Sequence, residues 1–277
     1  MKELSTVQKI ERSINKKYRK SIWNPFINGI KSYQLVQKGD SVAVCVSGGK
    51  DSMLLAKLMQ LLHRYSEIPF DIKFIVMNPG YNEINLQKII ANAETLNIPI
   101  DIFDSDIFEV VSKTDRSPCY LCARMRRGYL YSHAQKLGCN KIALGHHFSD
   151  VVETTLMGML FGAQVQTMMP KLRSKNFHNM ELIRPMYCIH ENDIIAWKRY
   201  NNLSFIQCAC PLSDNCNIYD VSGGISARQK VKSLLRELKE DNKDVEKSIF
   251  QSMHMVNLNT VIGYKLDGKE HSFLDDY

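Results

Sequence analysis

The chain has 277 residues, of which 44% are hydrophobic, and its formal net charge is +7. This length and apolar content suffice for a full hydrophobic core, which excludes a mainly disordered protein. No run reaches the roughly 18 to 20 consecutive apolar residues of a membrane-spanning helix, and the polar start lacks the apolar middle of a secretory signal. We therefore expect a soluble cytoplasmic protein with no membrane partner.

Positive charge is concentrated in residues 1–38. This segment holds nine Lys and Arg against two Glu, and Tyr18, Trp23 and Tyr33 lie among the basic residues. Basic side chains bind phosphates and aromatic rings stack on unpaired bases, so the segment is predicted to be a basic helical arm that binds RNA. A solvated amphipathic helix has the same composition and remains the alternative.

Residues 39–210 are predicted to form one domain in which strands alternate with helices. Residues 42–46 are a short apolar run rich in Val, and residues 52–62 repeat Leu at helical spacing. Further strands are expected at 72–77, 98–103, 141–144 and 182–184, and further helices at 85–96, 122–137, 151–161 and 192–200. Residues 211–277 are expected to form a helical C-terminal segment, with helices near 225–239 and 245–258. The alternation predicts an α/β fold with a parallel sheet covered on both faces, and a ligand site at the carboxyl ends of its strands.

A glycine-rich loop joins the first strand to the helix that follows it. Its residues are Ser47, Gly48, Gly49, Lys50, Asp51 and Ser52. Glycines let the backbone approach a ligand closely, and the free amides at a helix start attract anions. Lys50 adds a positive charge for a phosphate, and Asp51 can hold Mg²⁺. The strict ATPase P-loop spacing is absent, which disfavours a generic NTPase motor; a plain turn capped by serine is the alternative.

Two close cysteine pairs stand out among the eight cysteines: Cys119 with Cys122, and Cys208 with Cys210. In a reducing cytosol such pairs indicate metal or redox chemistry. The first pair begins a helix that carries three arginines, and both the positive charge and the helix start favour the thiolate form. The residues alone fit a closed zinc site with four thiolates and a 4Fe-4S cluster with three thiolates equally well.

A second polar motif follows the strand expected at 141–144. It consists of Gly145, His146, His147, Phe148, Ser149 and Asp150. Because it also follows a strand, it is expected at the same sheet edge as the glycine-rich loop, where His146 and Asp150 can face the same ligand. For His147 a purely structural role is an equal alternative.

The glycine-rich loop resembles the SGGxDS signature of the PP-loop ATP pyrophosphatases. That family cleaves ATP between its α and β phosphates, so that pyrophosphate leaves and AMP activates a carbonyl or carboxylate. The resemblance implies a Rossmann-like domain of the adenine nucleotide alpha hydrolase type. It also implies ATP and Mg²⁺ as ligands of residues 47–52.

A longer stretch, residues 38–235, resembles the tRNA 2-thiocytidine synthetases. Those enzymes combine SGGKDS, a CxxC helix, a GHHxxD segment and a later cysteine, all of which stand in this chain. Three cysteines of the family hold a 4Fe-4S cluster whose free iron is thought to carry sulfide. The resemblance implies Cys119 and Cys122 as the first two ligands and Cys210 as the third. Cys208 is the alternative, because Cys-Ala-Cys stands where Cys-x-x-Cys is typical, and an extra stretch here includes Cys216.

The same resemblance implies roles for other polar residues. In the family the segment of Gly145 and His146 contacts ATP, and Asp150 is a candidate general acid, general base or Mg²⁺ contact. Arg126, one helical turn beyond Cys122, matches a basic position implicated in catalysis and can stabilise charge that develops during activation. Together with Asp51, Arg126 and Asp150 are the expected catalytic residues.

The function implied by the resemblance is ATP-dependent sulfur transfer to tRNA. The C2 oxygen of a cytidine is adenylated, pyrophosphate leaves, and sulfide from the cluster replaces AMP. The implied partners are tRNA, a cysteine desulfurase or another sulfide donor, and a second subunit of the same chain. Two alternatives stay open: a PP-loop sulfur transferase acting on tRNA uridine or a small molecule, and a zinc-containing nucleotide-binding regulator.

Overall fold

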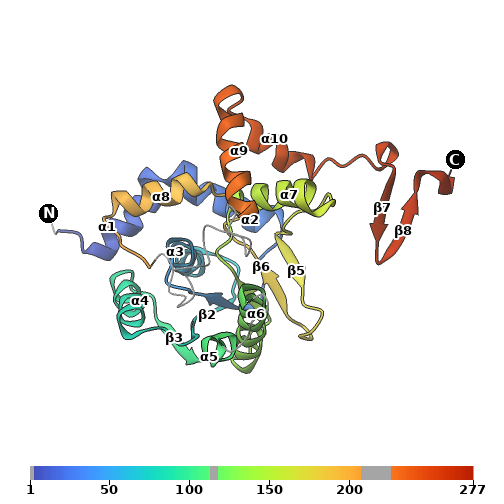
Figure 1. Cartoon of the computed structure of the whole chain (residues 1–277). Helices are drawn as coiled ribbons and strands as arrows, with labels where there is room; N and C mark the ends of the chain where they lie inside the picture. Colours follow the sequence, from blue (N-terminus) through green and yellow to red (C-terminus); the bar gives the residue numbers. More distant parts are fainter. Residues whose placement is uncertain (1–2, 113–117, 207–225, 277) are drawn as a thin grey trace. The chain divides into compact units, whose positions relative to one another are not determined.

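A six-stranded sheet forms the centre of the computed structural model, which describes residues 3–112, 118–206 and 226–276 (Figure 1). The strand order is β3-β2-β1-β4-β6-β5, in which β5 alone runs antiparallel to its neighbour. The strands are β1 Ser41–Cys45, β2 Asp71–Asn78, β3 Ile100–Asp104, β4 Lys141–Ala143, β5 Lys171–Arg173 and β6 Glu181–Ile183. The predicted α/β fold with a mainly parallel sheet is therefore confirmed; strand β5 was not anticipated.

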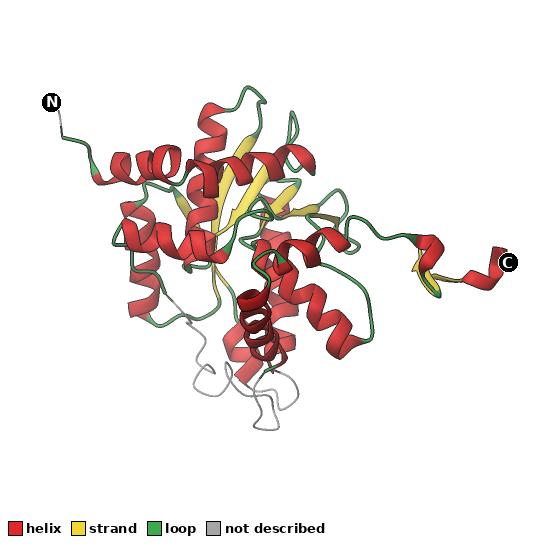
Figure 2. Cartoon of the chain, turned by 90° about the horizontal axis from the view of Figure 1, so that it is seen from above, coloured by secondary structure: helices red, strands yellow, loops and turns green. Residues whose placement is uncertain are grey.

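Helices lie on either side of the sheet in Figure 2. Those that follow the strands are α3 Lys50–Tyr65, α4 Glu83–Thr95, α5 Ile107–Ser112, α6 Pro118–Lys136, α7 Phe148–Gly162 and α8 Glu191–Tyr200. Strand β1 shows why both faces are covered, since its side chains alternate between two cores. Val42 and Val44 pack with the leucines of α3, whereas Ala43 and Cys45 pack with Tyr131 of α6. This alternation of fully apolar residues is what a parallel strand buried on both faces requires.

The N-terminal helical run has an apolar period of four residues. Its elements are α1 Thr6–Arg12, two π-helical segments η1 Ser13–Lys17 and η2 Arg19–Trp23, and α2 Asn24–Ser32. The buried hydrophobic residues are Ile10, Ile14, Tyr18, Ile22, Phe26 and Ile30. In a regular α-helix, with 3.6 residues per turn, such a row drifts about 40° with every repeat. The wider π turns offset this drift, so the row stays against the core and the basic residues stay outside.

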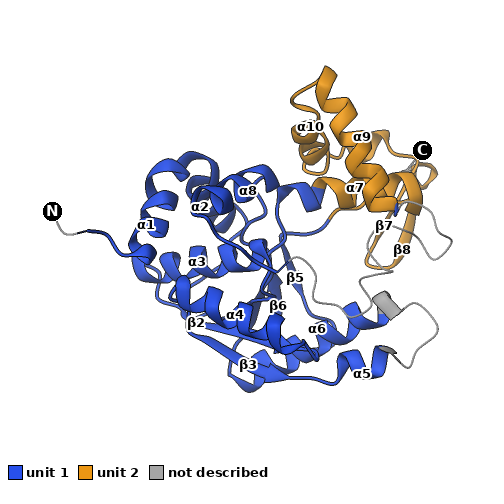
Figure 3. Cartoon of the chain, turned by 60° about the vertical axis from the view of Figure 1, so that its left-hand side comes forward, with its two compact units in different colours: residues 1–151, 168–226 blue, residues 152–167, 227–277 orange. Residues whose placement is uncertain are grey.

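The chain divides into two compact units (Figure 3). Residues 1–151 and 168–226 make up the first, so the N-terminal helices share the core of the sheet domain. The second comprises residues 152–167 and 227–277, with helices α9 Ala227–Asp241 and α10 Val245–Ser252. It also contains a hairpin, β7 Gly263–Leu266 and β8 Lys269–Ser272, where the sequence predicted only helices. The proposed boundaries at 38 and 210 stay a prediction.

Among the described residues no helix is long and apolar enough to cross a membrane.

A buried ion pair connects the start of β1 to the start of β4. Lys141 Nζ lies 2.6 Å from Asp40 Oδ2 and donates to the Leu35 carbonyl oxygen at 3.0 Å. Both side chains are less than one tenth exposed. Burial raises the pKa of Asp40, but hydrogen bonds from Lys141, Asn140 and the Gln37 amide outweigh it and hold that pKa below its usual range.

Replacing Asp40 should therefore destabilise the sheet domain. Asp40→Ala leaves a buried ammonium without its nearest carboxylate, which typically costs about 3 kcal/mol of unfolding free energy. Urea unfolding at pH 7 measures the loss, and Glu3→Ala, which removes an exposed ion pair, should show no measurable change.

The same variant predicts a pH dependence. Since the folded pKa of Asp40 lies below its unfolded value of about 3.9, its contribution is present above that value and disappears as the pH falls through the folded pKa. The difference between wild type and Asp40→Ala should shrink in acid. An equal difference at neutral and acidic pH would contradict the assignment.

Candidate active site

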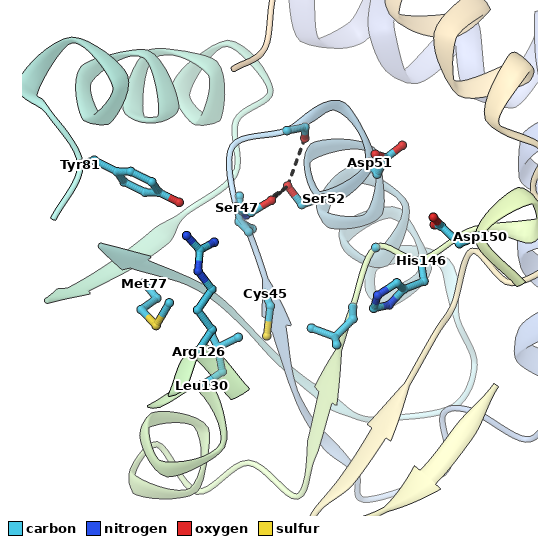
Figure 4. Close-up of a pocket in the computed structure, with 14 residues that line it drawn as sticks. Cys45, Ser47, Asp51, Ser52, Met77, Tyr81, Arg126, Leu130, His146 and Asp150 are labelled. Atoms are coloured by element: carbon cyan, nitrogen blue, oxygen red, sulfur yellow. Dashed lines mark hydrogen bonds between the residues drawn. The ribbon is translucent and has the colours of Figure 1, made fainter. Parts of the chain in front are cut away.

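A cavity of about 300 Å³ lies where strands β1 and β4 end (Figure 4). Its wall combines the glycine-rich loop, the end of β2, helix α6 and the residues after β4. Eight residues predicted for the site line this cavity: Ser47, Gly49, Asp51, Ser52, Arg126, Gly145, His146 and Asp150. Segments that lie far apart in the sequence thus meet at the sheet edge that the strand order predicts.

The glycine-rich loop takes its shape from Gly48 and Ser52. Gly48 has φ +82°, and a Cβ atom there would lie 2.5 Å from Ile89 Cγ1 and 2.7 Å from Ile206 Cδ1. Only glycine combines this conformation with so little space. Ser52 Oγ accepts hydrogen bonds from Ser47 N and Ser47 Oγ, both at 3.1 Å, and donates to the Gly49 carbonyl oxygen. The loop is therefore closed by its own hydrogen bonds.

Gly145 brings the second polar motif against the start of α3. A Cβ atom at this position would lie 3.1 Å from both the Asp51 carbonyl carbon and the Ser52 nitrogen. A side chain would push the two backbones apart. The absence of a side chain at Gly145 thus sets the distance between the glycine-rich loop and the His146 to Asp150 segment.

One buried histidine lies between the two carboxylates that were predicted to act in catalysis. His147 Nε2 is 3.7 Å from Asp51 Oδ1, and His147 Nδ1 is 3.4 Å from Asp150 Oδ2. The Asp150 amide donates to His147 Nδ1 at 3.3 Å, which assigns the proton of a neutral ring to Nε2, on the Asp51 side. His147 is only 3% exposed, so its buried ring contacts Asp51 and Asp150 from the protein side of the cavity.

Asp51 Oδ1 is the atom best suited to a cation. It is buried and has no hydrogen-bond partner among the described residues, although His147 lies nearby. A carboxylate oxygen in this condition fits Mg²⁺, which prefers hard oxygen ligands. Within the described segments no group of three or more His, Cys, Asp or Glu side chains could hold a metal ion. Phosphate oxygens and water are the usual further ligands of this ion.

Lys50 and Gly48 do not line the cavity. Lys50 Nζ instead lies 3.0 Å from Asp51 Oδ2 and 2.9 Å from Glu191 Oε1 at the start of α8. Burial alone would lower the pKa of Lys50, but the charges of Asp51 and Glu191 outweigh it and raise that pKa above its usual value. Lys50 thus carries a permanent charge that orients Asp51, and its contact with a phosphate stays a prediction.

Helix α6 links the cavity to the cysteines. Arg126 Nε donates to Cys122 Sγ at 3.3 Å, and Figure 4 shows the Arg126 side chain pointing toward the glycine-rich loop. Arg126 thus contacts one cysteine of the CxxC pair and also lines the cavity. Cys119 lies in the first turn of α6, but its side chain is outside the described part, as are Cys208, Cys210 and Cys216. The ligand set therefore stays a prediction.

Some lining residues were not predicted from the sequence. Met77 and Tyr81 close the cavity at the end of β2, and Figure 4 shows the Tyr81 hydroxyl directed toward it. Their signal was available, since Met77 lies at the carboxyl end of β2 and Tyr81 follows it. Cys45 also lines the cavity. Burial, followed by the neighbouring Cys139, raises the pKa of the Cys45 thiol to about 12, so this sulfur is a neutral packing group.

Comparisons with known proteins show the family of the chain. Residues 9–217 match the family described as the PP-loop domain. The chain is 32% identical to a tRNA-cytidine(32) 2-sulfurtransferase of Geobacter metallireducens, over 86% of this chain and 90% of the relative. It is 34% identical to an enzyme of the same name from Vibrio parahaemolyticus, over 83% and 75%. Its fold matches the U34-tRNA thiolase NcsA of Methanococcus maripaludis with its 4Fe-4S cluster, with a TM-score of 0.64, 20% identity, and coverage of 84% and 77%.

The close approach at Gly145 predicts a specific loss of nucleotide binding. Gly145→Ala must displace the backbone of Asp51 and Ser52, and crowding of this kind costs about 1–3 kcal/mol, so we expect about tenfold weaker ATP binding by calorimetry. Gly128→Ala is the matched control, because no atom lies within 4 Å of a Cβ there. In helix α6 it should stabilise the protein by about 0.5–1 kcal/mol and leave ATP affinity unchanged. Equal ATP affinity of the two variants would show that ATP binding does not depend on the close backbone contact at Gly145.

Proposed function

The chain belongs to the tRNA 2-thiocytidine synthetase family of PP-loop ATP pyrophosphatases, and we propose that it replaces the C2 oxygen of a tRNA cytidine with sulfur. Full-length relatives carry the name tRNA-cytidine(32) 2-sulfurtransferase, so cytidine 32 is the proposed target. One observation supports the reaction most directly. Arg126 both lines the cavity of the glycine-rich loop and donates to Cys122, so the ATP site and the cysteine helix share one space.

The first half of the proposed reaction is adenylation. The amides at the start of α3 hold the phosphates in the loop that the Ser47 and Ser52 hydroxyls shape, and Mg²⁺ held by Asp51 would offset the phosphate charge. The cytidine C2 oxygen attacks the α-phosphorus, and pyrophosphate leaves with the electrons of the broken bond. Arg126 lies where it can stabilise the negative charge that builds up on the α-phosphate.

The second half is substitution at C2. A 4Fe-4S cluster held by Cys119, Cys122 and Cys210 would supply sulfide beside the activated base. Cys119 and Cys122 are three residues apart on α6, a spacing at which helix positions are neighbours, and thiolates are the ligands that iron-sulfur clusters use. When sulfur binds C2 and AMP leaves, a proton is released, and Asp150 is the proposed acceptor. Its contacts with His147 keep the carboxylate in place.

Partners follow from this chemistry. A base buried in a tRNA loop must leave its stack to reach the cavity, and sulfide must be replaced after each turnover by a cysteine desulfurase or another donor. A second subunit that completes the RNA surface stays a prediction. The alternatives of a uridine substrate or a structural zinc predict different products and metal contents, which one experiment can separate.

We expect Cys119→Ala to lose thiolation and iron while it keeps ATP binding. Protein purified without oxygen is analysed for iron, acid-labile sulfide and zinc, and the tRNA is digested and its nucleosides identified by mass spectrometry. Wild type should yield 2-thiocytidine and about four irons with four sulfides per chain, as a 4Fe-4S cluster requires. Cys188→Ala, which changes a cysteine outside the proposed ligand set, should resemble wild type.

Other results would contradict the proposal. Thiolation by Cys119→Ala would exclude the cysteine mechanism. Zinc without iron in wild type would favour a structural metal, and 2-thiouridine as the product would show that the modified base is a uridine.

A further inference from the structure

A groove of about 680 Å³ lies between the N-terminal helices and the end of α8. We call it the basic groove and define it by Lys9, Arg12, Lys16, Lys17, Tyr200 and Asn202. It is separate from the active-site cavity, with which it shares no lining residue.

The π-helical segments keep these basic residues in line. Because the buried row repeats every four residues, Arg12, Lys16 and Lys20 also repeat every four residues and form a parallel outer row. All three are exposed. In an uninterrupted α-helix this row would wind around the axis and its charges would point in different directions. The run instead presents a straight stripe of positive charge.

Acidic side chains do not neutralise this stripe. Glu11 is turned inward, where its two oxygens lie 2.8 Å from Lys57 Nζ and 3.0 Å from Arg64 Nη1. Glu3 pairs with Lys9 at 3.2 Å. Within the part of the chain that the structure describes, no carboxylate lies within 4.0 Å of the charged groups of Arg12, Lys16 or Lys17. Their charge is thus available to an anionic partner.

Tyr200 holds the Lys17 ammonium over its ring and exposes that ring to solvent. Lys17 Nζ lies 3.8 Å from the centre of the Tyr200 ring, and that ring is 53% exposed. Tyr18 contacts the ring edge and is itself held by a hydrogen bond to the Ala196 carbonyl oxygen. A prepositioned ammonium beside an exposed ring loses little freedom when it binds a phosphate.

We propose that the basic groove binds the phosphate backbone of the tRNA substrate at a distance from the reacting base. This inference rests on the proposed function. Helix α8 connects the two places, since Glu191 at its start pairs with Lys50 of the glycine-rich loop and Tyr200 ends it. Ten residues of helix set the two ends about 14 Å apart, a span that a folded RNA loop crosses readily. Contacts of this kind fix the position of the RNA without reading its sequence.

The test compares two pairs of lysines from the same N-terminal segment. Lys16→Gln/Lys17→Gln changes the basic groove, and Lys31→Gln/Lys38→Gln removes the same charge from a different hollow. All four lysines are exposed, so both variants should fold. Binding of unmodified tRNA is followed by fluorescence anisotropy at several salt concentrations, and ATP binding is measured separately.

The groove variant should bind tRNA at least about tenfold more weakly near 0.1 M salt, and the slope of log affinity against log salt should fall by about 1.4 to 1.8. The control pair should change affinity less than twofold, and both variants should bind ATP like wild type. In turnover, the groove variant should raise KM for tRNA and leave kcat unchanged.

Several outcomes would overturn the inference. Equal losses in both variants, or none in the groove variant, would contradict it while leaving the proposed function intact. Weaker binding to phosphatidylserine vesicles with unchanged tRNA affinity would assign the groove to a membrane surface instead. Failure of wild-type protein to bind tRNA at any salt concentration would contradict the proposed function as well.

Discussion

The close contact between Gly145 and the first turn of α3 is the constraint on which the site depends. The backbone after β4 lies so close to Asp51 and Ser52 that a Cβ atom on Gly145 would be 3.1 Å from the Asp51 carbonyl carbon and from the Ser52 nitrogen. Because the next residues follow rigidly, His147 comes to lie between Asp51 and Asp150. The parallel pairing of β1 with β4 brings their carboxyl ends together, and the backbone packing there determines where the two acids lie. Loss of this contact would separate the phosphate site from the acid that is proposed to accept a proton.

Helices α6 and α8 add the remaining charges, each from a different direction. Glu191 of α8 holds Lys50, which in turn holds one oxygen of Asp51 and leaves the other without a hydrogen bond among the described atoms. Arg126 of α6 connects the cavity to the sulfur of Cys122. The proposed adenylation bonds the α-phosphorus to the C2 oxygen, and the proposed sulfur transfer bonds sulfide to the C2 carbon, so both reagents must reach adjacent atoms of one base. High effective concentration in a shared space favours such a sequence of steps.

The sequence predicted those parts of the fold and site that depend on local patterns. Alternating apolar segments located every strand of the parallel part of the sheet, and the glycine-rich loop located one wall of the cavity, because both signals lie within a few residues. Glu191 could not be predicted as the partner of Lys50, since 141 residues separate them and neither residue reveals the other. Strand β5 and the hairpin of β7 and β8 are mostly exposed and lack the apolar run that marks the equally short, buried strands β4 and β6. The π turns were not predicted, because an apolar period of four over one or two turns fits an ordinary α-helix. Only over the whole run does the apolar row of an α-helix rotate away from the core.

The most direct test of the account is the fate of ATP in the presence and absence of unmodified tRNA, measured without oxygen with a sulfide source. The account predicts AMP and pyrophosphate only when tRNA is added, with one AMP formed for each thiolated cytidine. ADP and phosphate as products, or AMP formed equally fast without tRNA, would contradict adenylation of a tRNA base as the central step.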